Sequence, residues 1–152
     1  MLKRIAILLF ALAASVAAQP KDWRAEDDIR KRAELGLKVA EDQLESARAV
    51  YRKGDPYQAQ AQLEESLATM LEVYQMILEE GEDLRKNARR YKKVEIALRG
   101  IVRRLEDFER QTEVVDRGPI ARARQTVSLM RDNLLHAMLQ GGKLSPVEKV
   151  QP

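Results

Sequence analysis

A dense run of basic residues near the middle of the chain is the feature with the clearest capacity for chemistry. Its members are Arg85, Lys86, Arg89, Arg90, Lys92 and Lys93, and Arg99, Arg103 and Arg104 continue it. Such a patch can attract the phosphates of lipid headgroups, anionic envelope polymers or nucleic acid, most strongly at low salt. Acidic residues lie on both sides of the run, at Glu79, Glu80, Glu82 and Asp83 and again at Glu106, Asp107 and Glu109. The alternative is therefore a solvated connection whose charges partly pair among themselves.

Residues suited to catalysis or metal binding are scarce in the sequence. His136 is the one histidine, and there is no cysteine. A di-iron or zinc bundle needs Glu-x-x-His or His-Glu-x-x-His on one helix face, and the usual nucleophilic triads also need a histidine placed beside the nucleophile. His136 follows Leu134 by two positions, so it should lie away from the apolar stripe and at the surface. We predict that the protein is not an enzyme and holds no cofactor or metal.

The first twenty residues are typical of a secretory signal peptide. A charged start at Lys3 and Arg4 is followed by an apolar segment, and small residues at positions 16–18 precede Gln19. The apolar stretch covers residues 5–18, about 14 residues, whereas a helix needs about 20 to span a bilayer. We therefore expect residues 1–18 to be cleaved and the rest to be exported, either to the periplasm or out of the cell.

Composition favours long amphipathic helices and gives little guide to a partner. Charged residues make up 34% of the 152 residues and aromatic residues only 5%, while Gly and Pro are scarce; this balance is typical of helical chains. The formal net charge is +3, and loss of Lys3 and Arg4 with the leader would bring it close to neutral. Overall charge thus predicts no polyanionic partner, and export further disfavours nucleic acid.

Four segments carry apolar residues at alternating spacings of three and four, which places them on one face of a helix. The expected helices cover residues 25–53, 56–80, 90–112 and 119–140, after an N-terminal extension at 19–24. A single helix cannot bury its own apolar stripe, so helices that follow one another in the sequence should pack stripe against stripe. The pattern therefore predicts an all-α, antiparallel four-helix bundle. The central residues of the four stripes, which we expect in the core, are Leu44, Leu67, Ile101 and Leu134.

Gly54-Asp55-Pro56 predicts a tight turn between the first two helices. A glycine can take the positive φ that closes a helix, Asp55 can cap the next helix, and Pro56 suits the first helical position.

The remaining boundaries are marked in a similar way. Asp116-Arg-Gly-Pro119 predicts a cap and a start for the last helix, and Gly141-Gly142 predicts its end. Residues 141–152 offer few apolar anchors, so we expect a flexible C-terminal tail.

Residues 81–90 leave open how the second and third helices are connected. The segment begins at Gly81 and has Leu84 as its one large apolar residue, which favours a charged connection. An interior glycine costs only about 1 kcal/mol relative to alanine. The alternative is therefore one long helix from residue 57 to about 111, and hence a three-helix rod.

Residues 47–67 resemble a single helical hairpin of the tetratricopeptide-repeat family. The resemblance rests on Tyr51, the Gly54-Asp55 turn and the pattern Ala59, Leu63, Leu67 that follows it. It covers about 21 residues, without a second copy in the chain. The family membership would imply a protein-binding scaffold. The second half of the chain also looks like small exported helical proteins with no assigned role.

Together these features predict a non-catalytic helical bundle that acts as a structural or protein-interaction module of the cell envelope, through a protein partner or self-association. The alternative function is binding of an anionic membrane or envelope polymer through the basic segment at 85–93.

Overall fold

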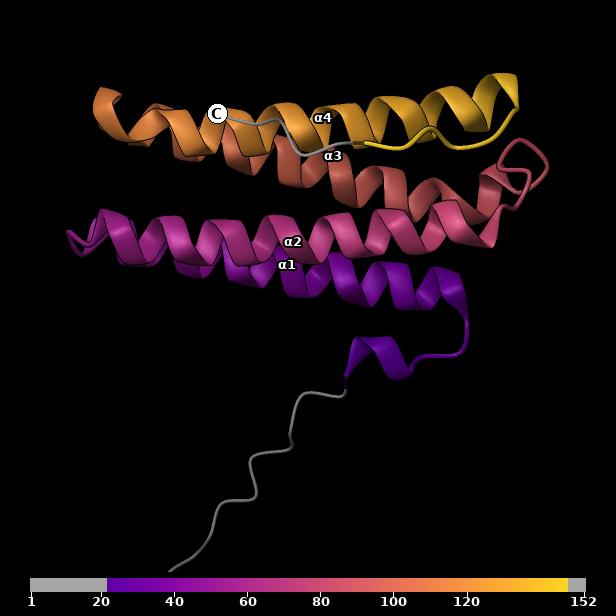
Figure 1. The fold of residues 1–152 in the computed structure, drawn as a ribbon, viewed down its shortest axis with the longest axis horizontal. Helices are drawn as coiled ribbons and strands as arrows, with labels where there is room; N and C mark the ends of the chain where they lie inside the picture. Colours follow the sequence, from indigo (N-terminus) through magenta and orange to yellow (C-terminus); the bar gives the residue numbers. More distant parts are fainter. Residues whose placement is uncertain (1–21, 148–152) are drawn as a thin grey trace, which may run out of the picture.

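The computed structural model describes residues 22–147, which form helices and no strands (Figure 1). The expected signal peptide at 1–18 and residues 19–21 lie outside the described residues. A short 3₁₀ helix, η1 (Trp23–Ala25), precedes α1 (Ile29–Arg52) and α2 (Pro56–Glu80). After a connection come α3 (Ala88–Gln111), a second 3₁₀ turn, η2 (Val114–Asp116), and α4 (Arg117–Gln140).

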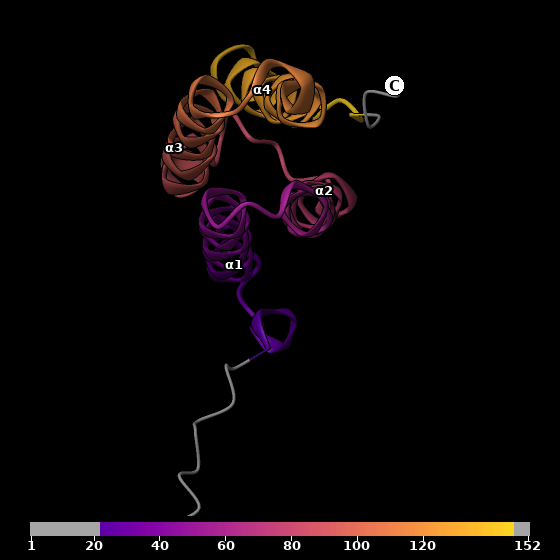
Figure 2. The same cartoon turned by 90° about the vertical axis from the view of Figure 1, so that its left-hand side faces the viewer.

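The four long helices form an antiparallel up-down-up-down bundle, which confirms the predicted fold class. Contacts are densest within the hairpins α1–α2 and α3–α4, and the hairpins meet through α1 against α3 and, less closely, α2 against α4. Around the bundle the order is thus α1, α2, α4, α3, so that α2 and α3 stand at opposite corners (Figure 2).

This diagonal relation explains the connection between α2 and α3. The chain leaves α2 at Gly81, which has a φ of +64°, and reaches α3 only at Ala88. The connection crosses the end of the bundle and buries Leu84, which is 1% exposed. The two middle helices are therefore separate, and the three-helix rod is excluded.

The core follows the predicted stripes. Leu44, Leu67, Ile101 and Leu134 are all buried, with exposed fractions of 4% or less. Because the same positions recur on each helix, one continuous apolar cluster runs the length of the bundle.

Glycine and aspartate form the first turn as predicted. Gly54 has a φ of +91°, and the Asp55 carboxylate accepts a hydrogen bond from the Gln58 N–H at 3.0 Å. Asp116 occupies the N-cap position of α4, as predicted, but its side chain makes no cap hydrogen bond. The Asp116 carboxylate instead accepts a hydrogen bond from the Tyr51 hydroxyl at 3.1 Å.

The N-terminal extension is part of the folded unit from residue 22 onward. Trp23 is 5% exposed and packs where Gly36 of α1 leaves room for its ring. Arg24 lies over the Trp23 ring and forms an ion pair with Glu72 of α2 at 2.6 Å. Helix α1 then begins at Ile29, four residues later than expected, because the Asp28 carboxylate caps it.

The C-terminal segment differs from the expected flexible tail as far as residue 147. The chain turns back at Gly141 and runs along α4 on the side of α2 (Figures 1 and 2). Leu144 is 6% exposed, and the Tyr74 hydroxyl donates a hydrogen bond to the Ser145 carbonyl at 2.6 Å. Buried Leu144, the partly buried Val147 and one hydrogen bond thus hold a segment whose sequence has few anchors.

Candidate functional site

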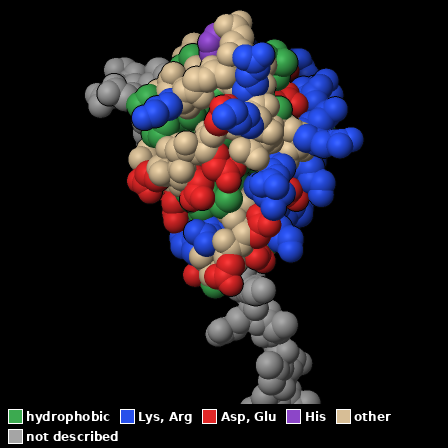
Figure 3. All heavy atoms as spheres, turned by 90° about the vertical axis from the view of Figure 1, so that its right-hand side faces the viewer, with side chains coloured by type: hydrophobic (Ala, Val, Ile, Leu, Met, Phe, Trp, Pro, Cys, Tyr) green, Lys and Arg blue, Asp and Glu red, His purple; other side chains and the backbone are tan. Residues whose placement is uncertain are grey.

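The structure brings three residues of the basic run beside two cations of α1. Arg89, Arg90 and Lys93 line a shallow hollow together with Arg30 and Lys31. Asp28 and Glu34 lie in the same hollow, so five cations face two carboxylates. Figure 3 views this end of the bundle and shows Lys and Arg side chains gathered on the flank of α3 and α1.

The other members of the basic run lie outside the hollow, on different parts of the surface. Lys86 lies 3.8 Å from Asp83, and Arg85 passes close to Gly141 at the end of α4. Lys92 is exposed on α3. Arg104 joins α3 to α1 through Glu41 at 2.7 Å and Glu45 at 3.0 Å. The segment at 85–93 is therefore divided between the hollow, the exposed face of α3 and the diagonal connection.

The flanking acidic residues do little to neutralise the hollow. Glu82 accepts a hydrogen bond from the Tyr91 hydroxyl at 3.0 Å, and burial together with this bond raises the pKa of Tyr91 above its usual range. Glu109 pairs with Arg124 of α4 at 2.9 Å, and Asp107 pairs with Arg110. Among the described residues, Asp83 is the only one of these flanking carboxylates that pairs with a cation of residues 85–93.

Inside the hollow, both carboxylates have partners of their own. Asp28 caps α1 through the N–H groups of Arg30 and Lys31 and pairs with the Arg30 guanidinium at 2.8 Å. Burial works against ionisation there, but these bonds lower the pKa of the Asp28 carboxyl. Glu34 lies 3.8 Å from Lys93. Within residues 22–147 no ion pair involves Lys31, Arg89 or Arg90, so their charges face solvent.

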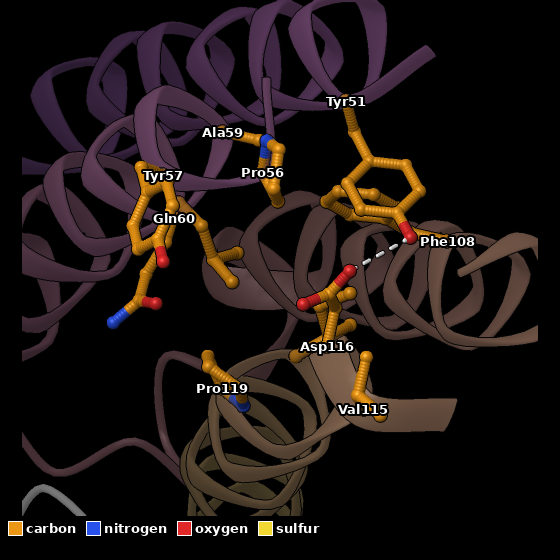
Figure 4. A pocket seen from close by; sticks show the side chains of 11 residues that line it. Tyr51, Pro56, Tyr57, Ala59, Gln60, Phe108, Val115, Asp116 and Pro119 are labelled. Atoms are coloured by element: carbon orange, nitrogen blue, oxygen red, sulfur yellow. Dashed lines mark hydrogen bonds between the residues drawn. The ribbon is translucent and has the colours of Figure 1, made fainter. Parts of the chain in front are cut away.

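A second surface lies at the opposite end of the bundle, where the two hairpin turns meet. A cleft of about 170 Å³ opens between the turns and takes side chains from all four helices (Figure 4). Its lining is aromatic and aliphatic apart from Gln60 and Asp116. The lining residues are Tyr51, Pro56, Tyr57, Ala59, Gln60, Leu63, Phe108, Val115, Asp116, Pro119 and Ile120.

One hydrogen-bonded group fixes the wall of the cleft. The Tyr51 hydroxyl donates to Asp116 at 3.1 Å and accepts from the Glu113 N–H at 2.9 Å. The Tyr51 ring meets Phe108 edge to face, with centroids 5.8 Å apart. Asp116 is the only acidic residue of the lining, and among the described residues no cation pairs with it.

The mouth of the cleft is unusually apolar for a solvated surface. Tyr57 is 86% exposed and Val115 89% exposed, and both line the cleft. Val114, beside Val115, is 74% exposed. In Figure 4, Tyr57 and Val115 stand on opposite sides of the opening. An exposed apolar group around a cleft is the arrangement expected of a binding surface.

The described residues that were considered for catalysis or metal binding do not come together in one site. His136 is exposed on α4, as predicted. Among residues 22–147 no three His, Asp or Glu side chains stand close enough to hold a metal ion. None of the helices in that range combines the length and apolar character needed to cross a bilayer. What the arrangement offers chemically is two surfaces, one cationic and one apolar with a carboxylate.

The cleft was missed from the sequence although its signals were present. Tyr57 and the Val114-Val115 pair fall outside the apolar stripes of their helices, and such residues are signals of exposed apolar surface. The predicted antiparallel bundle already places the first and third turns at the same end, but which side chains of the two turns meet depends on the order of the helices around the bundle. The contribution of Arg30 and Lys31 to the basic surface likewise depends on the packing of α1 against α3.

No family model matches the chain, and neither the curated proteins nor the solved structures gave a match. The resemblance of residues 47–67 to a tetratricopeptide-repeat hairpin stays a prediction.

Proposed function

We propose that the protein is an exported, non-catalytic helical bundle that acts as an interaction module of the cell envelope and binds a protein partner at the end cleft. The observation that carries the proposal is the pair of exposed apolar residues, Tyr57 and Val115, at the mouth of a cleft lined by aromatic and aliphatic side chains. Leaving such side chains in water is unfavourable, and a partner that covers them gains their burial.

The chemistry of the lining indicates the kind of partner. An aliphatic or aromatic side chain suits a cleft walled by Phe108, Pro119 and Ile120. Asp116, whose carboxylate already holds the Tyr51 hydroxyl, favours a lysine or arginine of the partner beside that side chain. A second copy of the chain is the alternative occupant.

Site-specific photo-crosslinking in the organism that makes the protein tests the proposal. A photoreactive phenylalanine analogue replaces Tyr57 in one version and Leu139, which is 68% exposed at the other end of α4, in the matched control. We expect one discrete product from position 57 and none from 139. Mass spectrometry of the product distinguishes a foreign protein from a second copy.

Val115→Glu supplies the second arm of the test. Because Val115 is 89% exposed, the substitution should leave the helical signal and the melting temperature unchanged. It should, however, remove the crosslinked product at position 57, since a charge would stand at the mouth of the cleft. Equal products from positions 57 and 139, or a product that survives Val115→Glu, would refute the cleft as the binding surface.

A further inference from the structure

The outer face of α3 carries a stripe of cations with one apolar residue in its middle. Arg89, Lys92, Ile96, Arg99 and Arg103 follow one another at spacings of three and four, which places them on one side of the helix. All five are exposed, and Ile96 is 47% exposed. The stripe extends over about 21 Å at a rise of 1.5 Å per residue.

Few carboxylates oppose this stripe. Before Asp107 the acidic residues of α3 are Glu95 and Glu106. Glu95 is 9% exposed and is engaged by Arg99 at 3.1 Å. Within the described part of the chain Arg89, Lys92 and Arg103 form no ion pair, so their charges are available to an external anion.

Helix α1 extends the same surface. Arg30 and Lys31 lie beside Arg89 in the hollow between the helices. Asp28 pairs with Arg30 and Glu34 pairs with Lys93, so within the described residues Lys31, Arg89 and Arg90 are the cations of the hollow that no carboxylate pairs with. The cations therefore spread over two neighbouring helices, and Figure 3 shows them on one flank.

We propose that this α1/α3 basic face binds the surface of an anionic phospholipid bilayer, with Ile96 entering the headgroup layer. A spread of cations suits the many phosphates of a flat surface better than it suits one small anion. An apolar side chain surrounded by Lys and Arg is the pattern of interfacial membrane-binding helices. The proposal goes beyond the partner site, because it concerns the outer face of α3 with part of α1 and shares no residue with the lining of the cleft.

Vesicle partitioning of residues 19–152, the expected mature chain, tests the electrostatic part. The probes are vesicles of phosphatidylcholine alone and of phosphatidylcholine mixed with phosphatidylglycerol, at low and at raised salt. We expect binding to the mixed vesicles only, and release by salt because exposed charges are screened within about 10 Å at 0.1 M.

Matched charge reversals locate the surface. Arg89→Glu with Lys92→Glu should weaken partitioning at least about tenfold. Arg52→Glu with Lys53→Glu, at the other end of α1, changes the net charge equally and should weaken it far less. Both pairs are exposed, so far-ultraviolet circular dichroism should show an intact fold in each variant.

A labelling experiment tests the role of Ile96. The chain has no cysteine, so Ile96→Cys can carry a single environment-sensitive dye. Its emission should shift to the blue on mixed vesicles, while the same dye at Leu139→Cys should not respond. Ile96→Ser should weaken partitioning several-fold, and Leu139→Ser should not.

Several outcomes would overturn the proposal. One is that wild type ignores mixed vesicles at low salt; another is that the two charge-reversal pairs act equally. The absence of a blue shift at position 96 would show that Ile96 does not enter the headgroup layer, and would rule out the bilayer as the bound surface. Tighter binding to duplex DNA than to vesicles at the same salt, lost in the Arg89/Lys92 variant, would assign the face to nucleic acid instead.

Discussion

Two glycines inside helices differ in the space around them. At Gly36 in α1, a Cβ atom would lie 2.5 Å from Val73 Cγ2 and 2.9 Å from Trp23 Cε3. At Gly100 in α3, nothing lies within 4 Å of the same atom. The first glycine is thus required by packing, because η1 and α2 close on that point of α1, whereas the second is not.

Alanine substitution should separate the two sites. Removing a helical glycine gains about 1 kcal/mol of helix propensity, so Gly100→Ala should raise the free energy of unfolding by about 0.5–1 kcal/mol. In Gly36→Ala, overpacking costs about 1–3 kcal/mol and should outweigh that gain. Chemical denaturation of both variants measures the difference; a stabilised Gly36→Ala would mean that Trp23 does not occupy its place beside α1.

Because of Tyr91, the free energy of unfolding should depend on pH in the alkaline range. Its hydroxyl is buried and bonded to Glu82, so its pKa in the folded protein lies above the usual value of 10.0. The contribution of Tyr91 to stability is therefore fully present below pH 10 and decreases above it, where the unfolded chain ionises first. Tyr91→Phe should cost about 1 kcal/mol at neutral pH through the lost hydrogen bond.

The test is the difference in melting temperature between wild type and Tyr91→Phe as pH rises. Loss of lysine charge destabilises both proteins, so only their difference isolates Tyr91. It should shrink above pH 10. Tyr57→Phe, at an exposed position, should follow wild type throughout; a constant gap for Tyr91→Phe would show that the hydroxyl is not buried in the folded state.

At the scale of elements, the C-terminal segment is held by few contacts and should detach without unfolding the bundle. Leu144→Ala removes its buried anchor, and Tyr74→Phe removes the donor to Ser145. The loss should be less than the 2–5 kcal/mol typical of a core leucine, because the segment can leave before the helices do.

Hydrogen exchange read by mass spectrometry checks this prediction. Amides of residues 142–147 should exchange faster in both variants, with those of the four helices unchanged. Leu139→Ala, at a side chain 68% exposed, is the control and should alter neither. If Leu144→Ala lowers the melting temperature as much as Leu134→Ala, the segment belongs to the cooperative core instead.

Sequence predicted the helices well because their stripes repeat many times. The core positions Leu44 and Ile101 were found by periodicity alone, and the first turn by the backbone demands on Gly54. Burial of Trp23, Leu84 and Leu144 could not be found in this way. Each is a single apolar residue in an irregular segment, so no repeat reveals which face it meets.

At the scale of the whole molecule, the helix order around the bundle decides which residues become neighbours. Up-down-up-down connectivity allows α2 and α3 to be adjacent or diagonal, and the stripes are the same in both cases. The diagonal order found here packs α3 against α1, so that Arg89 lies in the same hollow as Arg30 and Lys31. It also gathers the turns at Pro56 and Val115 around one cleft. Both candidate surfaces thus result from a choice that periodicity does not encode.

The basic face and the end cleft share no lining residue, and we expect them to act independently. Arg89 and Phe108 are both on α3, about 28 Å apart at 1.5 Å per residue. At that distance, substitutions without shared contacts add within about 0.5 kcal/mol. Arg89→Glu with Lys92→Glu should therefore leave the crosslink at position 57 intact, and Val115→Glu should leave vesicle partitioning intact. In the combined variant, the crosslink should be as weak as in Val115→Glu alone, and vesicle partitioning as weak as in the charge-reversed pair alone.

Two other outcomes would contradict independence. If the charge reversal removed the crosslink in intact cells but not with the purified partner, membrane attachment would be needed to bring the partner within reach. If the crosslink were lost in both settings, the two surfaces would be coupled through the bundle.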